Sequence, residues 1–263
     1  MGLCAVVFGM LWNDAGVAPW IAAIGAVATG AVGGSVNAAL ITRLGLPPLI
    51  VTLGTFSLFR GLAEAFTGGT KAYTNFPESF LALGNAFFLG VPVQAWIFIV
   101  VAVAIWLLVH RTTFGRAFRA LGFAPEGARY AGIPVERRLA LAYTLAGAVA
   151  GLAAVIFVSR VTEARANAGG GYELAAITAV VLGGTSIFGG VGTVHGTLLG
   201  VAAVAVLANG LSRIIKIMDI SRELSGMLTG ALLLLALAAG ALGKWLSVRR
   251  ARPRSGDLQS PTQ

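Results

Sequence analysis

The stretch from Tyr172 to Ser212 limits the possible folds more than any other part of the chain, because it carries one formal charge, Glu173. As a single helix its roughly 40 residues would measure about 60 Å, twice the ~30 Å hydrocarbon core of a bilayer. It must therefore fold back, giving two arms near crossing length, Tyr172–Ile187 and Val194–Ser212. A glycine cluster between them predicts the turn. Its residues are Gly183, Gly184, Gly189 and Gly190.

The same glycine-rich sequence, GGTSIFGGVGTVHGTLLG, has two other interpretations. A phosphate-binding P-loop needs GxxxxGK[ST], and no lysine or arginine lies between Arg165 and Arg213, so this chemistry is excluded. Glycines spaced every four residues let two helix backbones approach closely. That spacing favours close packing at Gly192, Gly196 and Gly200. The pairs Gly30/Gly34 and Gly147/Gly151 share it, and for them chance spacing in glycine-rich helices explains the pattern equally well.

Composition places the chain in a membrane. Hydrophobic residues make up 57% of the chain and charged residues 11%, whereas soluble domains contain about 25% charged residues. Apolar runs near the ~20 residues that a helix needs to cross a bilayer recur along the chain. They are Val17–Ile41, Leu46–Phe66, Val93–His110, Leu139–Ser159, Val194–Ser212 and Leu224–Gly243.

Two weaker apolar segments complete the predicted topology. Gly2–Trp12 is too short for a full crossing and is interpreted as part of a span, since it lacks the basic start of a signal peptide. Phe76–Val91 is interpreted as an interfacial or re-entrant piece. With the arm that begins at Tyr172, these segments predict an all-α, polytopic membrane helix bundle of about eight transmembrane segments, the first one partial.

The basic residues are distributed unevenly across this topology. Of the 19 lysines and arginines, twelve fall on the side of the Arg111–Arg138 connector and the C-terminal tail, six fall on the other side, and Arg60 lies within a span. The positive-inside rule assigns the richer side, and both termini, to the cytoplasm. The net charge of +9 is thus explained by topology rather than by nucleic-acid binding. We expect a transmembrane domain over residues 1–248 and a disordered basic cytoplasmic tail over 249–263.

No combination of side chains indicates catalysis, a metal site or a cofactor. His110 and His195 are far apart in the sequence, and the single cysteine, Cys4, excludes a cysteine-based zinc site. Arg60 and Glu64 lie four residues apart in a span, so they can pair on one helix face. Such a pair either belongs to a transport pathway or neutralises itself near the outer rim.

The connector from Arg111 to Arg138 is longer than two spans require, and it interleaves six arginines with apolar residues. We expect two short amphipathic helices, Arg116–Gly122 and Pro125–Ala131, separated by the helix breakers Gly122 and Pro125. Helices of this kind lie on lipid headgroups or dock into a groove of a partner protein. Composition does not decide between these two roles.

Three stretches carry a family resemblance. They are LPPLIVTLGTFSLFRGLA from Leu46, TTFGRAFRALGFAPEGARYAGIPVERR from Thr112, and GYELAAITAVVLGGTSIFGGVGTVHGTLLG from Gly171, with LANGL following at Leu207. Through them the chain resembles the sugar-import permeases of bacterial ABC transporters, the ribose, xylose and arabinose group. The resemblance implies a multi-pass inner-membrane subunit that pairs with a second permease subunit, identical or different. A partner ATPase would hydrolyse ATP, so the chain is not expected to be an enzyme, and an external binding protein would deliver the sugar.

The resemblance also implies that the connector couples the spans to the ATPase, with a short helix in a cleft of that partner. The residues assigned to this role are Gly115, Arg116, Gly122, Glu126, Ala128, Arg129 and Gly132. The chain departs from the family at Gly127, where alanine is common, and at Phe123-Ala124, where Gly-Asn is frequent.

Further expectations concern the beginning of the chain, the substrate and the competing function classes. Family members usually have two more spans before a D-L-S-V-G motif, and Met1-Gly2 lies about where that motif would end, so those spans are expected to be absent through a truncated gene or a misplaced start codon.

The sequence ELAAITAVVLGGTSIFGG and the departures of the connector from the family pattern favour rhamnose or the sugar-like quorum autoinducer as substrate. The alternative is a secondary transporter or channel, which would be expected to show internal repeats or midplane charges. A membrane-embedded enzyme would need convergent catalytic groups.

Overall fold

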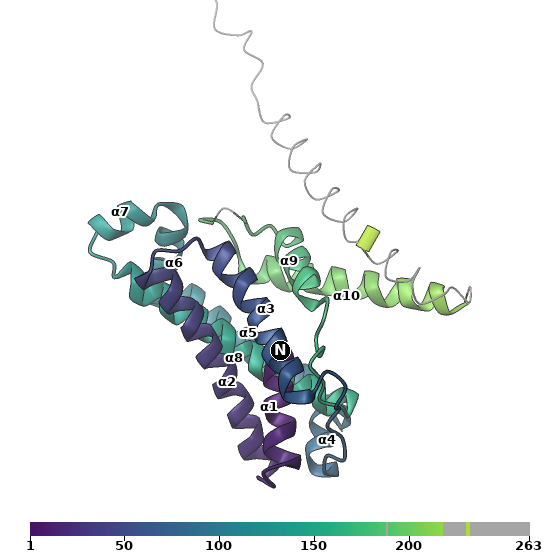
Figure 1. Ribbon diagram of the computed structural model, residues 1–263. Helices are drawn as coiled ribbons and strands as arrows, with labels where there is room; N and C mark the ends of the chain where they lie inside the picture. Colours follow the sequence, from purple (N-terminus) through teal and green to yellow (C-terminus); the bar gives the residue numbers. More distant parts are fainter. Residues whose placement is uncertain (188, 218–229, 232–263) are drawn as a thin grey trace, which may run out of the picture. The chain divides into compact units, whose positions relative to one another are not determined.

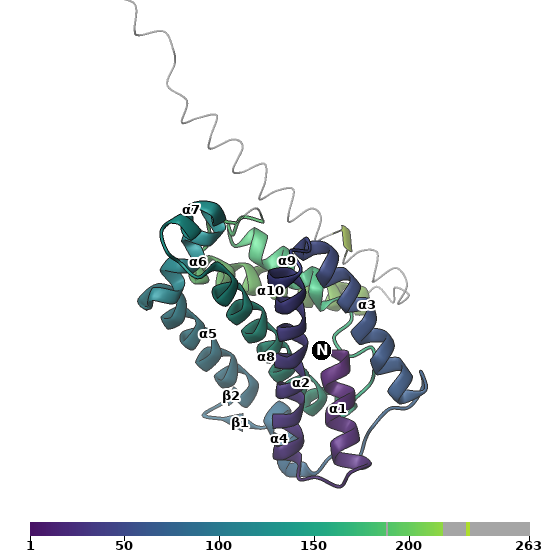
Figure 2. The ribbon, with the colours of Figure 1, turned by 60° about the vertical axis from the view of Figure 1, so that its left-hand side comes forward.

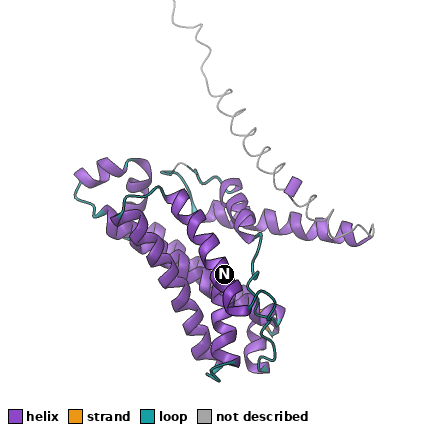
Figure 3. Ribbon diagram, viewed as in Figure 1, coloured by secondary structure: helices purple, strands orange, loops and turns teal. Residues whose placement is uncertain are grey.

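The computed structural model describes residues 1–187, 189–217 and 230–231, and most of them are helical (Figures 1 and 3). They form two compact units, 1–172 and the part from residue 173 onwards. The elements of the first unit are α1 (Gly2–Asn13), α2 (Pro19–Arg43), α3 (Pro48–Thr67), α4 (Glu78–Asn85), β1 (Phe87–Phe88), β2 (Val91–Pro92), α5 (Val93–Arg111), α6 (Thr113–Phe123), α7 (Pro125–Tyr130) and α8 (Val135–Val161). They are followed by α9 (Tyr172–Leu182) and α10 (Val194–Ile217).

Five helices in the described part of the chain are long and apolar enough to cross a bilayer. They are α2, α3, α5, α8 and the Val194–Leu211 part of α10, and they coincide with five of the predicted apolar runs. The mostly helical membrane architecture is thus confirmed, whereas α1 and α9 are apolar but shorter. The predicted span Leu224–Gly243 and the tail 249–263 lie outside the described residues.

The first arm of the glycine-separated segment is shorter than predicted. A helix over Tyr172–Ile187 was expected, but α9 ends at Leu182 after 11 residues, which corresponds to about 16 Å of helix. The helix stops because two glycines follow at once and Gly184 adopts a left-handed backbone conformation with φ of +89°. The expected near-crossing length of this arm is therefore wrong.

The weak apolar segment Phe76–Val91 contains the helix α4 and a two-stranded antiparallel hairpin. Phe87 pairs with Pro92 and Phe88 with Val91 in the hairpin, so the strictly all-α expectation missed these two short strands. Leu89 and Gly90 both have positive φ at the turn, as in the two-residue turns that suit the twist of a hairpin. Leucine is unusual at the first of these positions, and for that reason the sequence carried no hairpin signal.

Helices α2 and α8 pack with their backbones in close contact, as Figure 2 shows. A Cβ added at Gly30 would overlap the carbonyl oxygen of Gly147, and one added at Gly147 would overlap that of Gly30. Gly34 lies equally close to the Tyr143 backbone, and a Cβ at Gly151 would come within 2.8 Å of the Ala26 carbonyl oxygen. The two glycine pairs therefore lie opposite each other and confirm the close-packing interpretation.

The core of the first unit lies around α1. The Phe8 ring stacks on Phe80 with centroids 4.6 Å apart and meets Phe76 at 5.3 Å. The Ser159 hydroxyl donates to the Phe80 carbonyl oxygen at 2.8 Å and accepts from the Gly84 amide at 2.8 Å. Because Ser159 belongs to the last turns of α8, these bonds fix α4 at that end of the helix.

The contact between α2 and α8 yields a stability prediction. Gly147→Ala inserts a methyl group where the Gly30 carbonyl oxygen already lies, so the two helices must separate, at a cost of about 1–3 kcal/mol. Thermal unfolding of the purified protein in detergent should show a lowered Tm. In the matched control, Gly54→Ala on α3, the added Cβ meets no described atom within 4 Å, and Tm should stay unchanged or rise. Equal Tm values for both variants would contradict the close contact.

Candidate functional site

The connector between α5 and α8 begins with a tight turn at the start of α6. The Thr112 hydroxyl caps α6 by accepting a hydrogen bond from the Phe114 amide at 3.2 Å. Gly115 lies against the backbone of Val109, where any side chain would overlap the Val109 carbonyl group. The guanidinium carbon of Arg138 lies 4.2 Å from the centroid of the Phe114 ring, a cation–π contact that ties α6 to α8.

A small apolar core holds α6 and α7 against the beginning of α8. Leu121 of α6, Ala128 of α7 and Val135 of α8 are buried together. Partly buried apolar side chains surround them, and these are Phe118, Ala120, Ile133 and Leu139. The connector is therefore a compact substructure with its own core.

Helix α7 ends in a defined cap. Gly132 has a φ of +77°, a left-handed conformation that glycine adopts without steric cost. Its amide donates to the Arg129 carbonyl oxygen at 3.0 Å, and the Ile133 amide donates to the Ala128 carbonyl oxygen at 3.0 Å. This is the hydrogen-bond pattern of a Schellman motif, and Ile133 packs against the apolar cluster that contains Ala128. The cap fixes the direction in which the chain enters α8.

The outer surface of the connector presents exposed aromatic and charged side chains. Phe123 is 84% exposed and Tyr130 is 89% exposed. Exposed charged residues lie on the same two helices. We call this surface the α6–α7 tip, and it consists of Arg116, Arg119, Phe123, Glu126 and Tyr130.

The seven residues predicted to couple the connector to a partner lie in the connector but have different surroundings. Gly115 and Ala128 are buried, and Gly132 makes the cap of α7. Arg116 and Glu126 are exposed at the tip. The remaining two are Arg129, which forms an ion pair with Glu136 of α8, and Gly122, which lies inside α6.

The expected break at Gly122 is wrong, because α6 begins at Thr113 and continues through Gly122 to Phe123. The chain leaves the helix at Ala124, which has φ of −152° and ψ of 93°. A residue before proline is driven out of the helical region by contact with the proline ring, so Pro125 accounts for the break. From the sequence, Phe123 was recognised only as a departure from the family pattern. In the structure it is one of the most exposed aromatic side chains.

Of the predicted glycine turn and packing residues, those from Gly183 to Gly192 lie between α9 and α10, and Gly196 and Gly200 lie within α10, all in the second unit. Gly183 and Gly196 are in backbone contact, and Gly200 lies against the Ala179 carbonyl oxygen. The Ser186 amide donates to the Val191 carbonyl oxygen at 2.8 Å across the loop. The other glycines of the set shape the loop, with Gly184, Gly189 and Gly190 at positive φ and Gly192 packed against the Thr185 side chain.

Arg60 and Glu64 form an ion pair on α3, with 3.1 Å between Nε and Oε1. Their side chains are 52% and 49% exposed. The pair belongs to a candidate membrane-spanning helix and is separate in the fold from the α6–α7 tip.

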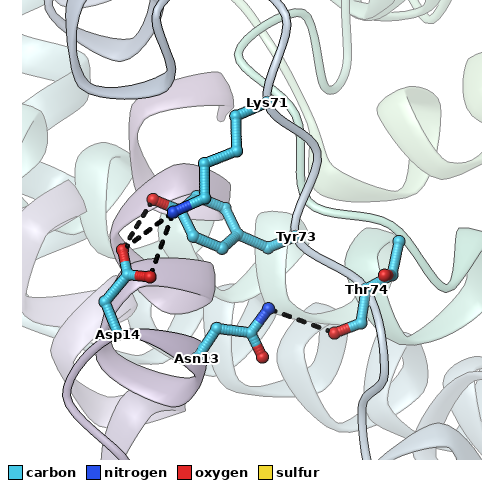
Figure 4. Close-up of polar contacts among 5 residues, drawn as sticks. All are labelled: Asn13, Asp14, Lys71, Tyr73 and Thr74. Carbon is cyan, nitrogen blue, oxygen red and sulfur yellow. Dashed lines mark hydrogen bonds and ion pairs between the residues drawn. The ribbon is translucent and has the colours of Figure 1, made fainter.

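A polar cluster links the end of α1 to the segment after α3 (Figure 4). The Lys71 ammonium group donates to both Asp14 carboxylate oxygens at 3.0 and 3.3 Å, and the Tyr73 hydroxyl donates to Asp14 at 2.9 Å. The Asn13 amide donates to the Thr74 carbonyl oxygen at 3.2 Å. Sequence reasoning missed this cluster, because its members are about 57 to 61 positions apart and show no spacing pattern.

These contacts shift the titration of the cluster. The hydrogen bond from Lys71, assisted by Tyr73, lowers the pKa of Asp14, and the same bond raises the pKa of Lys71. Burial of the ring and the bond to Asp14 raise the pKa of Tyr73. The cluster is therefore fully ionised at Asp14 and Lys71 over the neutral range.

Comparison with known proteins identifies the family. Residues 1–237 match the family described as "Branched-chain amino acid transport system / permease component". The chain belongs to this permease family. Similar proteins include the "Autoinducer 2 import system permease protein LsrD" of Photorhabdus luminescens, 38% identical over 92% of this chain and 73% of the relative. The protein of the same name from Yersinia pseudotuberculosis is 36% identical over 97% of this chain and 79% of the relative. That from Yersinia enterocolitica is 38% identical over 95% of this chain and 78% of the relative. No solved structure matches the chain significantly.

The chain is accordingly a multi-pass permease subunit of a bacterial ABC import system in the inner membrane. A system of this kind includes an ATPase and a substrate-binding protein. The resemblance drawn from the connector and the glycine-rich block is confirmed at the level of the family, including its autoinducer branch.

The Asp14 cluster gives a pH-dependent stability prediction. Because the folded-state pKa of Asp14 is lowered, its contribution to stability is present above the unfolded-state pKa of about 3.9 and is lost as the pH falls through the folded-state value. At pH 7, Asp14→Asn should lower the Tm of the purified protein, and the difference from wild type should shrink below pH 4. Glu78→Gln, at an exposed position on the neighbouring helix, is the control. A Tm difference that persists unchanged at low pH would contradict this role for the carboxylate.

Proposed function

We propose that this permease subunit imports a small sugar-like molecule, with autoinducer-2 as the first substrate to test, and that the α6–α7 tip receives the driving force from a cytoplasmic ATPase. The printed names of the relatives, which describe autoinducer-2 import, support the substrate. The structure of the connector supports the role of the tip. The observation that carries the proposal is a pair of aromatic side chains, Phe123 and Tyr130, exposed on a compact, capped helix pair.

The tip has the chemistry of a protein-binding surface. Aromatic residues and arginine supply most of the binding energy in protein interfaces, and polar residues surround them. Phe123 and Tyr130 would be the anchors, with Arg116, Arg119 and Glu126 around them. The lipid-headgroup alternative would suit Arg116 and Arg119 but would place Glu126 against the negative surface potential of the inner leaflet, whereas a protein partner can satisfy both signs of charge.

The connector can transmit force because it is joined firmly to two long helices. Gly115 brings α6 against the end of α5, and the core of Leu121, Ala128 and Val135 joins both short helices to α8. Helix α8 is 27 residues long, which corresponds to about 40 Å. Movement of the tip would therefore displace α8 and, through its glycine contact, α2.

The proposed orientation puts the tip in the cytoplasm. Helix α8 begins beside α7 and ends beside α4, so the tip and α4 lie at opposite ends of the first unit (Figure 2). All six arginines of the connector lie at the tip end, whereas Lys71, Arg160 and Arg165 lie at the α4 end. The positive-inside rule favours a cytoplasmic tip, and a substrate-binding protein would then approach from the α4 end.

The full proposal has eight membrane segments with both termini in the cytoplasm, and two of these segments, α1 and α9, are shorter than a full crossing. A second permease subunit, of the same or a different sequence, would complete the pore. The chain would act without catalysis of its own, with ATP hydrolysed by the partner. A secondary transporter or channel is the alternative, and it would import its substrate without any ATPase.

Removal of the aromatic anchors tests the tip. Phe123→Ala with Tyr130→Ala should reduce co-purification of the ATPase at least tenfold, because two exposed anchors of an interface are lost. Both side chains are exposed, so the fold should be unaffected. Phe87→Ala, at an exposed aromatic residue of the hairpin β1–β2, is the matched control and should retain the ATPase. Full retention by the double variant would show that the tip is not the contact.

Uptake measurements test the function class. Cells that lack their own importer, and express this chain with its ATPase, its partner permease and its binding protein, should accumulate autoinducer-2. A Walker-motif lysine substitution in the ATPase should abolish uptake, since hydrolysis drives transport. Undiminished uptake in that strain would support a secondary transporter instead.

A further inference from the structure

Helix α3 packs through one face only. Val51, Thr55, Ala63 and Thr67 are buried, and Phe59, which completes their four-residue spacing, touches Gly33 of α2. The Thr55 and Thr67 hydroxyls donate to the carbonyl oxygens of Val51 and Ala63 at 3.0 and 2.9 Å. The polar groups of the packed face are thus satisfied within the helix.

The opposite face of α3 is exposed and, for a membrane helix, unusually polar. It carries the Arg60–Glu64 pair beside small residues at spacings of three and four. Apart from the adjoining residues and backbone of α3 itself, no heavy atom of the described residues lies within 4 Å of a Cβ added at Gly54 or Gly61. We call this surface the open face of α3, and it consists of Gly54, Ser57, Arg60, Gly61 and Glu64.

The depth of the pair makes contact with lipid unfavourable. Helix α3 continues from Arg60 to Thr67 for about two turns, so the Arg60 backbone lies roughly 10 Å inside the end of the span. Charged side chains at such depth are rare on surfaces that face lipid, and they usually face a bundle interior or a water-filled cavity. Within the described part of the chain, the pairing of Arg60 with Glu64 leaves most guanidinium N–H groups and carboxylate lone pairs without a protein partner.

Helix α5 shows the chemistry expected of a lipid-facing surface and provides a contrast within the same unit. None of its residues is buried by the described part of the chain, and it carries no charge between Val93 and His110. Its most exposed side chains are apolar, and they include Phe98, Ile99, Val100, Val103 and Leu107. The two helices thus differ in what they expose: α5 exposes mainly apolar side chains, whereas α3 exposes Ser57, Arg60 and Glu64 in addition to apolar residues such as Ile50 and Leu53.

We propose that the open face of α3 borders the water-filled route of the substrate, and that Arg60 and Glu64 hydrogen-bond the hydroxyl groups of a small polyhydroxylated molecule as it passes. This inference rests on the proposed function, because it requires a polar substrate that crosses beside this subunit. The guanidinium group offers donors and the carboxylate offers acceptors. Gly54 and Gly61 have no side chains, so they leave space beside the pair for the substrate. A packed helix is the less favoured occupant, because it would bury the ion pair at a high desolvation cost.

Cysteine labelling in membranes tests the location of this face. Ser57→Cys and Val100→Cys are compared in the assembled transporter, and the wild-type chain with its single, buried Cys4 gives the blank. A charged, membrane-impermeant methanethiosulfonate reacts with the thiolate, which forms in water and not in hydrocarbon. Ser57→Cys should therefore react at least about tenfold faster than Val100→Cys, and bound substrate should slow it. Equal rates, or a disulfide cross-link between Ser57→Cys subunits in place of labelling, would overturn the proposal.

Transport kinetics test the roles of the two charges. Arg60→Gln and Glu64→Gln should each raise KM for autoinducer-2 uptake about tenfold, as expected for the loss of a hydrogen bond to a charged group, with the amount of co-purified ATPase unchanged. The double variant Arg60→Gln with Glu64→Gln carries no charge and separates the two explanations. If the pair only neutralised itself, the double variant would have the wild-type KM, and that result would overturn the proposal.

The two proposals fail in distinguishable ways. If the unmodified chain and its partners import no sugar-like molecule, the proposed function is wrong, and the labelling rates of Ser57→Cys and Val100→Cys still report whether the open face of α3 meets water. If uptake is normal but the two cysteines label alike, the function stands and the open face of α3 does not border the route.

Discussion

The backbone contact between α2 and α8 is the constraint on which the first unit depends. Carbonyl oxygens and Cα atoms of the two helices meet at Gly30 and Gly147, without any side chain between them. In a bilayer the hydrophobic effect does not bring helices together, so close van der Waals contact at small residues takes over that role. Because α2 and α8 are joined, other elements of the unit take their positions from contacts with this pair. Hydrogen bonds of Ser159 hold helix α4 to the end of α8. A small apolar core holds the α6–α7 connector to the beginning of α8.

This arrangement makes α8 the natural link between the two ends of the unit. The tip and the Asp14 cluster lie at opposite ends, and each is stiffened by different means. At the tip, an apolar core and a glycine-capped helix preserve the shape of the connector. At the other end, ionic and aromatic contacts hold the segment after α3 to α1 (Figure 4). Under the proposed coupling, a displacement of the tip would be transmitted along α8 to the far end of the unit.

Much of this fold could be predicted from the sequence, because the constraints that a membrane imposes are simple. The long apolar runs, the ion pair of Arg60 with Glu64 and the turn after Leu182 follow from span length, helix spacing and glycine. The hairpin at Leu89-Gly90 was missed because its turn lacks the usual residues, and the Asp14 cluster was missed because distant segments build it. The end of α6 was misplaced by one residue, since proline acts on the residue before it and a single glycine does not stop a helix. Among the residues predicted to couple the connector to a partner, the sequence could not tell exposed from buried positions, and the exposure of Phe123 became evident only in the structure of α6.

A photo-crosslinking residue at position 130 tests whether the α6–α7 tip docks on the ATPase. In cells that contain the whole transport system, irradiation should join Tyr130→p-benzoyl-phenylalanine to the ATPase subunit, because this side chain is proposed to lie in the docking cleft of the ATPase. The same residue at position 87, at the opposite end of the unit, should give no ATPase adduct. An adduct between position 130 and the external binding protein, or an ATPase adduct from position 87, would contradict both the orientation and the role assigned to the tip.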